Sequence, residues 1–217
     1  MKPEDLIKCI NKSCKKSINP AFNLSPTDSN PKLRHFIIDG RSCAVNNREE
    51  KVKVLKWFDL ESSDLERSDT FWLFLEIKFG YIGNKNETEI NISLSVFQGE
   101  DKIDEKYQLF RAEWDDYNNP DEKHAQPHWH ITSNQANENT FEEHVSVSSE
   151  SEFVRDFGNE KQKVLDVKKI HFAMNADWQQ EKGDYIHKVE DEQQIVRWLQ
   201  GMLNYIRTEI EYLYSAF

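Results

Sequence analysis

Three of the seven histidines fall close together, at His124, His128 and His130, and a short stretch upstream carries Arg111 and Glu113. Imidazole and carboxylate groups bind transition metals and transfer protons near neutral pH. A guanidinium beside them can bind an anion or stabilise developing negative charge. This stretch is therefore the candidate for chemistry, and the surrounding elements decide whether its side chains meet.

The pattern of apolar residues predicts three strands in this part of the chain, over 107–114, 127–132 and 167–174. Side chains alternate between the two faces of a strand, so the polar residues between apolar ones turn outward, away from the core. Neighbouring antiparallel strands would bring these polar side chains onto one surface. We expect five of them to converge there: Arg111, Glu113, His128, His130 and His171.

Such a set supports two chemistries. In the first, His128 and His130 bind a divalent transition metal such as zinc, with His171 or a carboxylate as the third ligand and one position open for water. In the second, Glu113 and a histidine act as base and acid while Arg111 stabilises negative charge, as in phosphodiester cleavage without a metal.

Plainer interpretations also fit. The face can be a recognition surface without chemistry, an outward His-x-His on a strand is often only a polar face, and an Arg–Glu pair is often a surface ion pair of little energetic consequence. Solvation explains His124 as well as a role in the site does. The remaining histidines are assigned to structural or exposed positions: His35, His144 and His187.

Length and charge narrow the class of protein. The 217 residues fit one large domain, or a domain with a small extension. Asp and Glu outnumber Lys and Arg by 39 to 28, giving a net charge of −11. This balance argues against general nucleic-acid binding, which depends on clustered cations. An acidic surface fits a basic protein partner or a small substrate, and the composition leaves the oligomeric state open.

The three cysteines are odd in number and lack the usual zinc-knuckle spacing, which favours free thiols in a reducing compartment. Neither an apolar leader nor a membrane-length apolar run is visible, so we expect a cytoplasmic protein without a membrane segment. Motifs of kinases, nucleotide switches, serine hydrolases and zinc fingers are also missing from the sequence.

Helical spacing of apolar residues occurs at both ends of the chain. Residues 3–17 form a short amphipathic pattern, and a much longer one runs from 191 to about 214 with Asp191 as the expected N-cap. We divide the chain into an N-terminal helix and loop at 1–33 and a single domain at 34–217. A polar surface excursion is expected within that domain at about 133–159.

Apolar–polar alternation predicts the sheet. A hairpin around Asp39 and Gly40 is expected, and residues 60–69 look like a polar connection with a helical turn. Further strands are expected at 51–58, 70–79 and 88–97. The fold class is therefore α+β: a mostly antiparallel twisted sheet with the long C-terminal amphipathic helix packed on one face.

Two short segments, Leu109-Phe110-Arg111 and Pro127-His128-Trp129-His130, resemble a pattern in small toxin-like proteins of mobile bacterial gene islands. Those proteins carry a Phe-Arg strand followed by a Pro-His-rich strand. The likeness covers these two segments alone, and the long insert after residue 133 departs from it. It implies a toxin or defence-type context and assigns no residue role.

Two functional hypotheses follow. The first is a histidine-based hydrolytic or phosphoester-directed domain that uses the five polar residues. The second is a non-catalytic acidic protein, such as an antitoxin, an inhibitor or a complex subunit, that docks on a basic partner. The convergence of the five residues favours the first, whereas the net charge of −11 favours the second.

Overall fold

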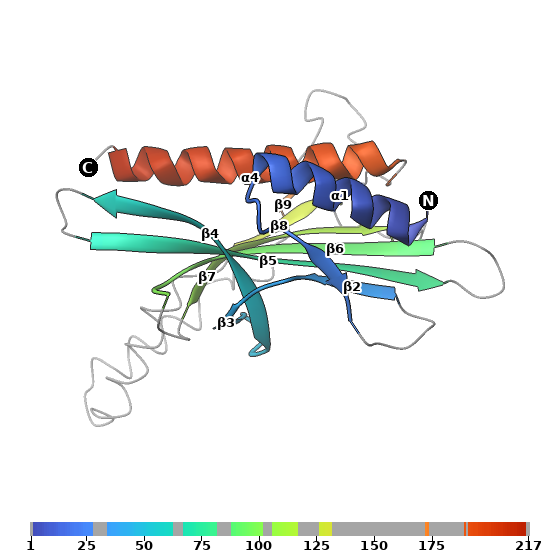
Figure 1. Cartoon of the computed structure of the whole chain (residues 1–217), viewed down its shortest axis with the longest axis horizontal. Helices are drawn as coiled ribbons and strands as arrows, with labels where there is room; N and C mark the ends of the chain where they lie inside the picture. Colours follow the sequence, from blue (N-terminus) through green and yellow to red (C-terminus); the bar gives the residue numbers. More distant parts are fainter. Residues whose placement is uncertain are drawn as a thin grey trace, which may run out of the picture.

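The structure is a computed structural model that describes residues 2–27, 34–62, 67–81, 88–101, 106–116, 126–131, 172–173, 189 and 191–215. Two helices cover one face of a twisted antiparallel sheet (Figure 1). The predicted α+β class is confirmed. In the part of the chain that the structure describes, no helix has the length and apolar character needed to cross a membrane.

The sheet is centred on two long strands, β5 (Arg67–Tyr81) and β6 (Thr88–Gln98). Hydrogen bonding gives the order β1-β2-β5-β6-β7-β8-β9, in which each described pair is antiparallel. The remaining strands on this path are β1 (Leu24–Pro26), β2 (Arg34–Ile38), β7 (Tyr107–Asp116), β8 (His128–Ile131) and β9 (Phe172–Ala173).

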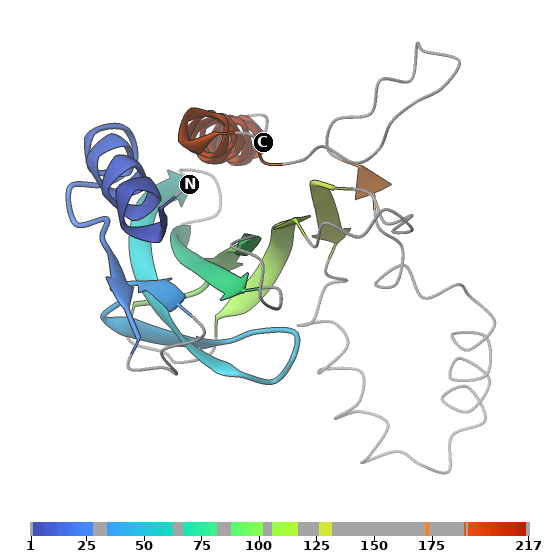
Figure 2. The same ribbon diagram turned by 90° about the vertical axis from the view of Figure 1, so that its right-hand side faces the viewer.

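One edge of β5 is shared by two partners. Its first half pairs with β4 (Lys51–Ser62), and its second half pairs with β2. Only the later part of β4 fits on that edge, so its first residues pair instead with β3 (Ser42–Val45). The β3–β4 hairpin therefore leaves the plane of the sheet, and Figure 2 shows it below the sheet, opposite the helices.

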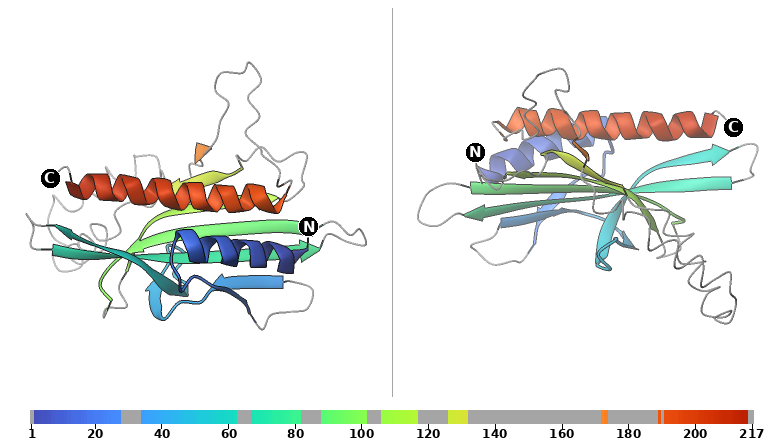
Figure 3. Two further views of the ribbon diagram at one scale, coloured as in Figure 1. Left: turned by 45° about the horizontal axis from the view of Figure 1, so that its top comes forward. Right: turned by 180° about the vertical axis from the view of Figure 1, so that it is seen from behind.

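The two helices, α1 (Pro3–Ser17) and α4 (Glu192–Ser215), lie side by side on the other face (Figures 2 and 3). Their apolar stripes supply buried core residues, because helical positions three and four apart share a face. The N-cap of α4 is confirmed, since the amide of Gln194 donates to Oδ1 of Asp191 at 2.7 Å. Both α1 and β1 join the common core and sheet, although they fall within the predicted extension at 1–33.

The predicted hairpin around Asp39 and Gly40 is wrong. Strands β2 and β3 do not pair with each other, because β2 pairs with β1 and β5 whereas β3 pairs with β4. Gly40 instead lies against the backbone of β4, where an added Cβ would come within 2.4–2.5 Å of Val54 atoms. Glycine is needed there for close approach of two backbones rather than for a tight turn.

The predicted connection at 60–69 is also wrong at both ends. Strand β4 continues to Ser62, and β5 begins at Arg67. The residues at these strand ends lie in cross-strand pairs, for example Leu60 opposite Asp69. Their polar composition is why the sequence did not indicate a strand. The expected surface excursion at about 133–159 lies outside the described residues.

Candidate functional site

Glu113 lies in the middle of β7, on the face opposite the helices. On the helix face of the same strand, the ring of Trp114 packs against that of Trp198 in α4 with centroids 5.4 Å apart. Alternation then turns Arg111 and Glu113 to the other face. In the register with β8, Glu113 is opposite His128 and Arg111 is opposite His130.

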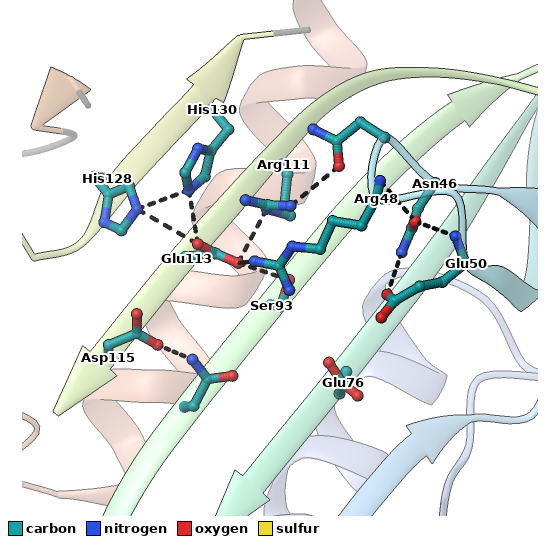
Figure 4. A network of polar contacts seen from close by, with 12 residues as sticks. Asn46, Arg48, Glu50, Glu76, Ser93, Arg111, Glu113, Asp115, His128 and His130 are labelled. Atoms are coloured by element: carbon teal, nitrogen blue, oxygen red, sulfur yellow. Dashed lines mark hydrogen bonds and ion pairs between the residues drawn. The ribbon is translucent and has the colours of Figure 1, made fainter. Parts of the chain in front are cut away.

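The predicted convergence is confirmed for four of the five residues, and their function stays a prediction. Arg111, Glu113, His128 and His130 meet in one place, shown in Figure 4. His171 lies outside the described residues. Its predicted strand at 167–174 is described only at Phe172–Ala173, which pairs with β8.

One carboxylate oxygen of Glu113 faces the two histidines. Its Oε2 lies 2.7 Å from Nε2 of His130 and 3.5 Å from Nε2 of His128. The two imidazole nitrogens are themselves 2.9 Å apart. Three atoms that could each offer a lone pair to a metal ion thus lie within 3.5 Å of one another.

The other carboxylate oxygen of Glu113 faces two guanidinium groups. Nε of Arg111 lies 3.0 Å from Oε1, and Nη2 of Arg48 donates to the same oxygen at 3.1 Å. The hydroxyl of Ser93 in β6 also reaches Oε1, at 3.5 Å. The carboxylate is therefore divided, with cations on one oxygen and imidazoles on the other.

The turn between β3 and β4 brings Arg48 to this position. The side chain of Asn46 fastens the turn, because its Oδ1 accepts from the amides of Arg48 and Glu50, each at 2.9 Å. Glu49 takes the left-handed conformation, with a φ of 62°. In the same turn, Oδ1 of Asn47 accepts from Nη1 of Arg111 at 3.1 Å, which attaches the turn to β7.

This face points away from the helices, as expected, but its side chains are buried rather than open to solvent. His128 is 0% exposed, Glu113 6%, and Arg111 and His130 8% each. The β3–β4 turn lies across β7 and covers part of a face that would otherwise be open. Arg48 differs from the others, because half of its side chain (51%) is exposed.

Electrostatics keep Glu113 ionised. Burial alone raises the pKa of its carboxyl group, but hydrogen bonds from His128 and His130 and the charge of Arg111 outweigh burial and hold the pKa well below its usual range. Burial also lowers the pKa of Arg111, Glu113 raises it and Arg48 lowers it. An arginine pKa starts so high that the guanidinium remains charged.

The group that we call the Glu113 cluster consists of Glu113, Arg48, Arg111, His128 and His130. Zinc bonds of 2.0–2.1 Å in a tetrahedral site place neighbouring ligand atoms roughly 3.3 Å apart. The three separations among Oε2 of Glu113 and the two Nε2 atoms, 2.7, 2.9 and 3.5 Å, bracket that value. Glu113, His128 and His130 therefore fit a divalent transition metal with small adjustments.

A cavity of about 320 Å³ adjoins the cluster. Its lining includes Arg48 and Glu113 together with Lys78, Asn91 and Asp115. Pockets for small ligands start at about this volume. Arg48 and Glu113 are thus the members of the cluster that border a space for a small molecule.

Sequence analysis missed Arg48 and Asn47. The Asn-Asn dipeptide marks a turn, but nothing local indicates that this turn reaches a strand more than sixty residues later. It also missed that His35 lies 2.7 Å from Glu76, a second histidine–carboxylate pair on the same face.

Comparisons with models of known protein families, with curated proteins and with solved structures find no match to this chain. A fold alone would not identify a function in any case, because unrelated activities share folds. The site itself must therefore carry the functional argument.

Proposed function

We propose that this protein is a hydrolase whose Glu113, His128 and His130 hold a divalent transition metal such as zinc. The observation that carries the proposal is the convergence of Oε2 of Glu113 and two imidazole Nε2 atoms within 2.7–3.5 Å in a buried position. Two histidines and one carboxylate form the ligand set of several catalytic zinc centres, where a further position holds water.

Hydrogen bonds alone do not satisfy every close contact among these three atoms. A ring nitrogen carries at most one hydrogen. The Nε2 atom of His130 lies 2.7 Å from the Glu113 carboxylate and 2.9 Å from Nε2 of His128, so a single hydrogen cannot lie along both lines. A metal ion that displaces the Nε2 hydrogens would meet a lone pair from each of the three atoms, which supports the proposal.

The chemistry that a bound metal supplies is a water molecule with a pKa near 7, so that hydroxide is available at neutral pH. Such a metal would supply a nucleophilic oxygen for hydrolysis: water would lose one proton to solvent, its oxygen would bond to the electrophilic atom of the substrate, and the bond to the leaving oxygen would break. The leaving oxygen would take a proton from solvent. Water is consumed, and no oxidant or reductant is needed.

Arg111 is a positioning residue in this proposal rather than the anion clamp suggested by its sequence context. Its Nε contacts Glu113 and its Nη1 donates to Asn47, so the guanidinium is held in place and buried. Its positive charge keeps Glu113 ionised and therefore able to bind a metal. His171 remains a predicted additional ligand.

The first experiment is elemental analysis of the full-length, untagged protein after dialysis, with His130→Ala and His35→Ala in parallel. His35 is a matched control, because it also lies 2.7 Å from a carboxylate on the same face. We expect about one transition-metal ion per chain in the wild type and in His35→Ala, and at least tenfold weaker binding in His130→Ala.

Hydrolysis of bis(4-nitrophenyl) phosphate is measured on the same samples, with thermal unfolding to show that each variant is folded. We expect activity that chelation and His130→Ala both remove. Metal without hydrolysis of this or of a carboxylic ester probe would contradict the enzymatic role and leave the metal site standing. A wild type that binds no metal would contradict both.

The net charge of −11 favours a second candidate, a non-catalytic protein that docks on a basic partner. Its binding would weaken gradually as acidic surface residues are neutralised, and it would weaken further with rising salt. Substitution of the buried members of the Glu113 cluster would then affect binding only through a loss of stability. Both candidates fit the toxin or defence-type context that the two short segments suggest.

A further inference from the structure

We infer that the substrate is a phosphoester whose phosphate group binds between the metal and Arg48, with Arg48 leaving Glu113 to do so. The inference rests on the proposed metal site and adds the substrate class and the residue that selects it. Three features support it: the exposed side chain of Arg48, the charged residues that line the cavity, and the paired N–H groups of a guanidinium.

Arg48 is the member of the Glu113 cluster that can move. Its backbone is fixed by Asn46, but its long side chain is 51% exposed and ends in a contact with Oε1 of Glu113. Only the Arg48 end of this ion pair is exposed, and Oε1 of Glu113 keeps the buried Arg111 guanidinium at 3.0 Å when Arg48 leaves. Arg111, in contrast, is 8% exposed and fastened to both Glu113 and Asn47.

The cavity beside Arg48 changes its electrostatic character when a metal binds. Its charged lining consists of two cations, Arg48 and Lys78, and three carboxylates, Glu89, Glu113 and Asp115. That balance is net negative and repels an anion. A divalent metal on Glu113 reverses the sign, so an anion is attracted only to the metal-loaded site.

A phosphate group fits the two charges that would then face each other. Its oxygens point in several directions, so one can approach the metal while others accept paired N–H groups from a guanidinium. Lys78 lies 2.9 Å from Glu76 and is engaged there. The volume of about 320 Å³ admits a small phosphoester or the exposed end of a longer one.

This arrangement makes a thermodynamic prediction. If phosphate binds only when metal is present, then by linkage metal must bind more tightly when phosphate is present, by the same factor. Arg48→Ala should remove most of that coupling and leave the three metal ligands in place. Arg34→Ala is the matched control, because Arg34 is also partly exposed (43%) and pairs with a single carboxylate, Glu4, on the helix side.

The test measures the affinity of the full-length protein for zinc by chelator competition, without and with dimethyl phosphate, inorganic phosphate or acetate. We expect either phosphate probe to tighten zinc binding at least tenfold in the wild type and in Arg34→Ala, and less than twofold in Arg48→Ala. Acetate should have little effect. The ratio of the two phosphate probes distinguishes a diester from a monoester site.

The outcomes separate the inference from the proposed function. A wild type that binds no zinc overturns both. Zinc binding that phosphate does not tighten, or coupling that survives in Arg48→Ala, overturns the inference and leaves the metal site standing. Equal coupling with acetate overturns the assignment to phosphate.

Discussion

Two carboxylates lie in one cross-strand row on the polar face of the sheet, and only one of them forms a candidate site. Glu76 in β5 is opposite Ser93 in β6, which is opposite Glu113 in β7. Each carboxylate has an imidazole nitrogen at 2.7 Å, from His35 and His130 respectively. Each also has a cationic group within 3.0 Å.

The two clusters differ in how these partners are distributed. His35 and Lys78 both contact Oε1 of Glu76, so a histidine and an ammonium share one oxygen. At Glu113 the cations lie on Oε1, and Oε2 faces imidazoles alone. A fixed ammonium beside the imidazole repels a metal ion. A second imidazole and the separation of the cations from the imidazoles together distinguish the Glu113 cluster as a candidate metal site.

The largest predicted effect on stability comes from neutralising Glu113, the carboxylate on which the comparison is centred. Glu113→Gln removes the negative charge that faces buried Arg111 and leaves an uncompensated guanidinium, which typically costs 3–5 kcal/mol. We expect the free energy of unfolding to fall by about 3 kcal/mol. Glu76→Gln leaves Lys78, whose ammonium group is better exposed than the Arg111 guanidinium, and should cost only about 1 kcal/mol.

Denaturant unfolding in the presence of a chelator measures both variants, so that metal binding does not contribute to the difference. The wild type under the same conditions is the reference. Equal losses for Glu113→Gln and Glu76→Gln would show that the two clusters are equivalent ion pairs, and the distinction drawn from their geometry would fail.

The strands could be predicted from sequence because alternation is a local property. In β6 the apolar residues from Ile90 to Val96 alternate with polar ones, and in β7 the same rule placed Arg111 and Glu113 together. Their convergence with His128 and His130 followed from a simple meander. Burial of this face did not follow, because it depends on an element from elsewhere in the chain.

That element is the β3–β4 hairpin, and its position is not encoded locally. Asn46 predicts a turn, but the contact of Arg48 with Glu113 joins residues 65 positions apart. The hairpin leaves the sheet because β2 occupies the rest of the edge of β5, which is a property of strand pairing. Expecting β2 and β3 to pair hid this arrangement.

The next prediction therefore concerns a substitution that should shift the β3–β4 hairpin. Gly40→Ala would place a Cβ within 2.4–2.5 Å of the backbone of Val54, so the backbone must shift. We expect a loss of about 2 kcal/mol, as in overpacked cores. The histidine ring signals of His128 and His130 in NMR spectra should also shift, whereas that of His35 should not.

Gly201→Ala is the control for this substitution. Gly201 lies in α4, and an added Cβ there meets no atom within 4 Å. Alanine is the better helix former, so this variant should gain about 0.5–1 kcal/mol. A shift of all three histidine signals in Gly40→Ala would mean that the hairpin supports the whole sheet rather than the Glu113 cluster alone.

The smallest predicted effect concerns pH and uses Glu76, which lies away from the proposed metal ligands. Burial raises the pKa of Glu76, but hydrogen bonds from His35 and Lys78 outweigh it and leave the pKa below its usual value. A carboxyl group with a lowered pKa in the folded state contributes stability above its unfolded pKa of about 4.3. That contribution disappears as pH falls through the lower folded value.

The stability difference between wild type and Glu76→Gln should therefore shrink between pH 5.5 and pH 3, by less than the roughly 1 kcal/mol expected for the substitution itself. Urea unfolding at several pH values measures it, and the glutamine variant serves as the reference because it cannot titrate at that position. A difference that stays constant would mean that His35 and Lys78 do not hold Glu76 in its ionised form. The contacts of Glu76 with His35 and Lys78 would then be ordinary polar contacts, and Glu76 would differ from Glu113 in charge as well as in geometry.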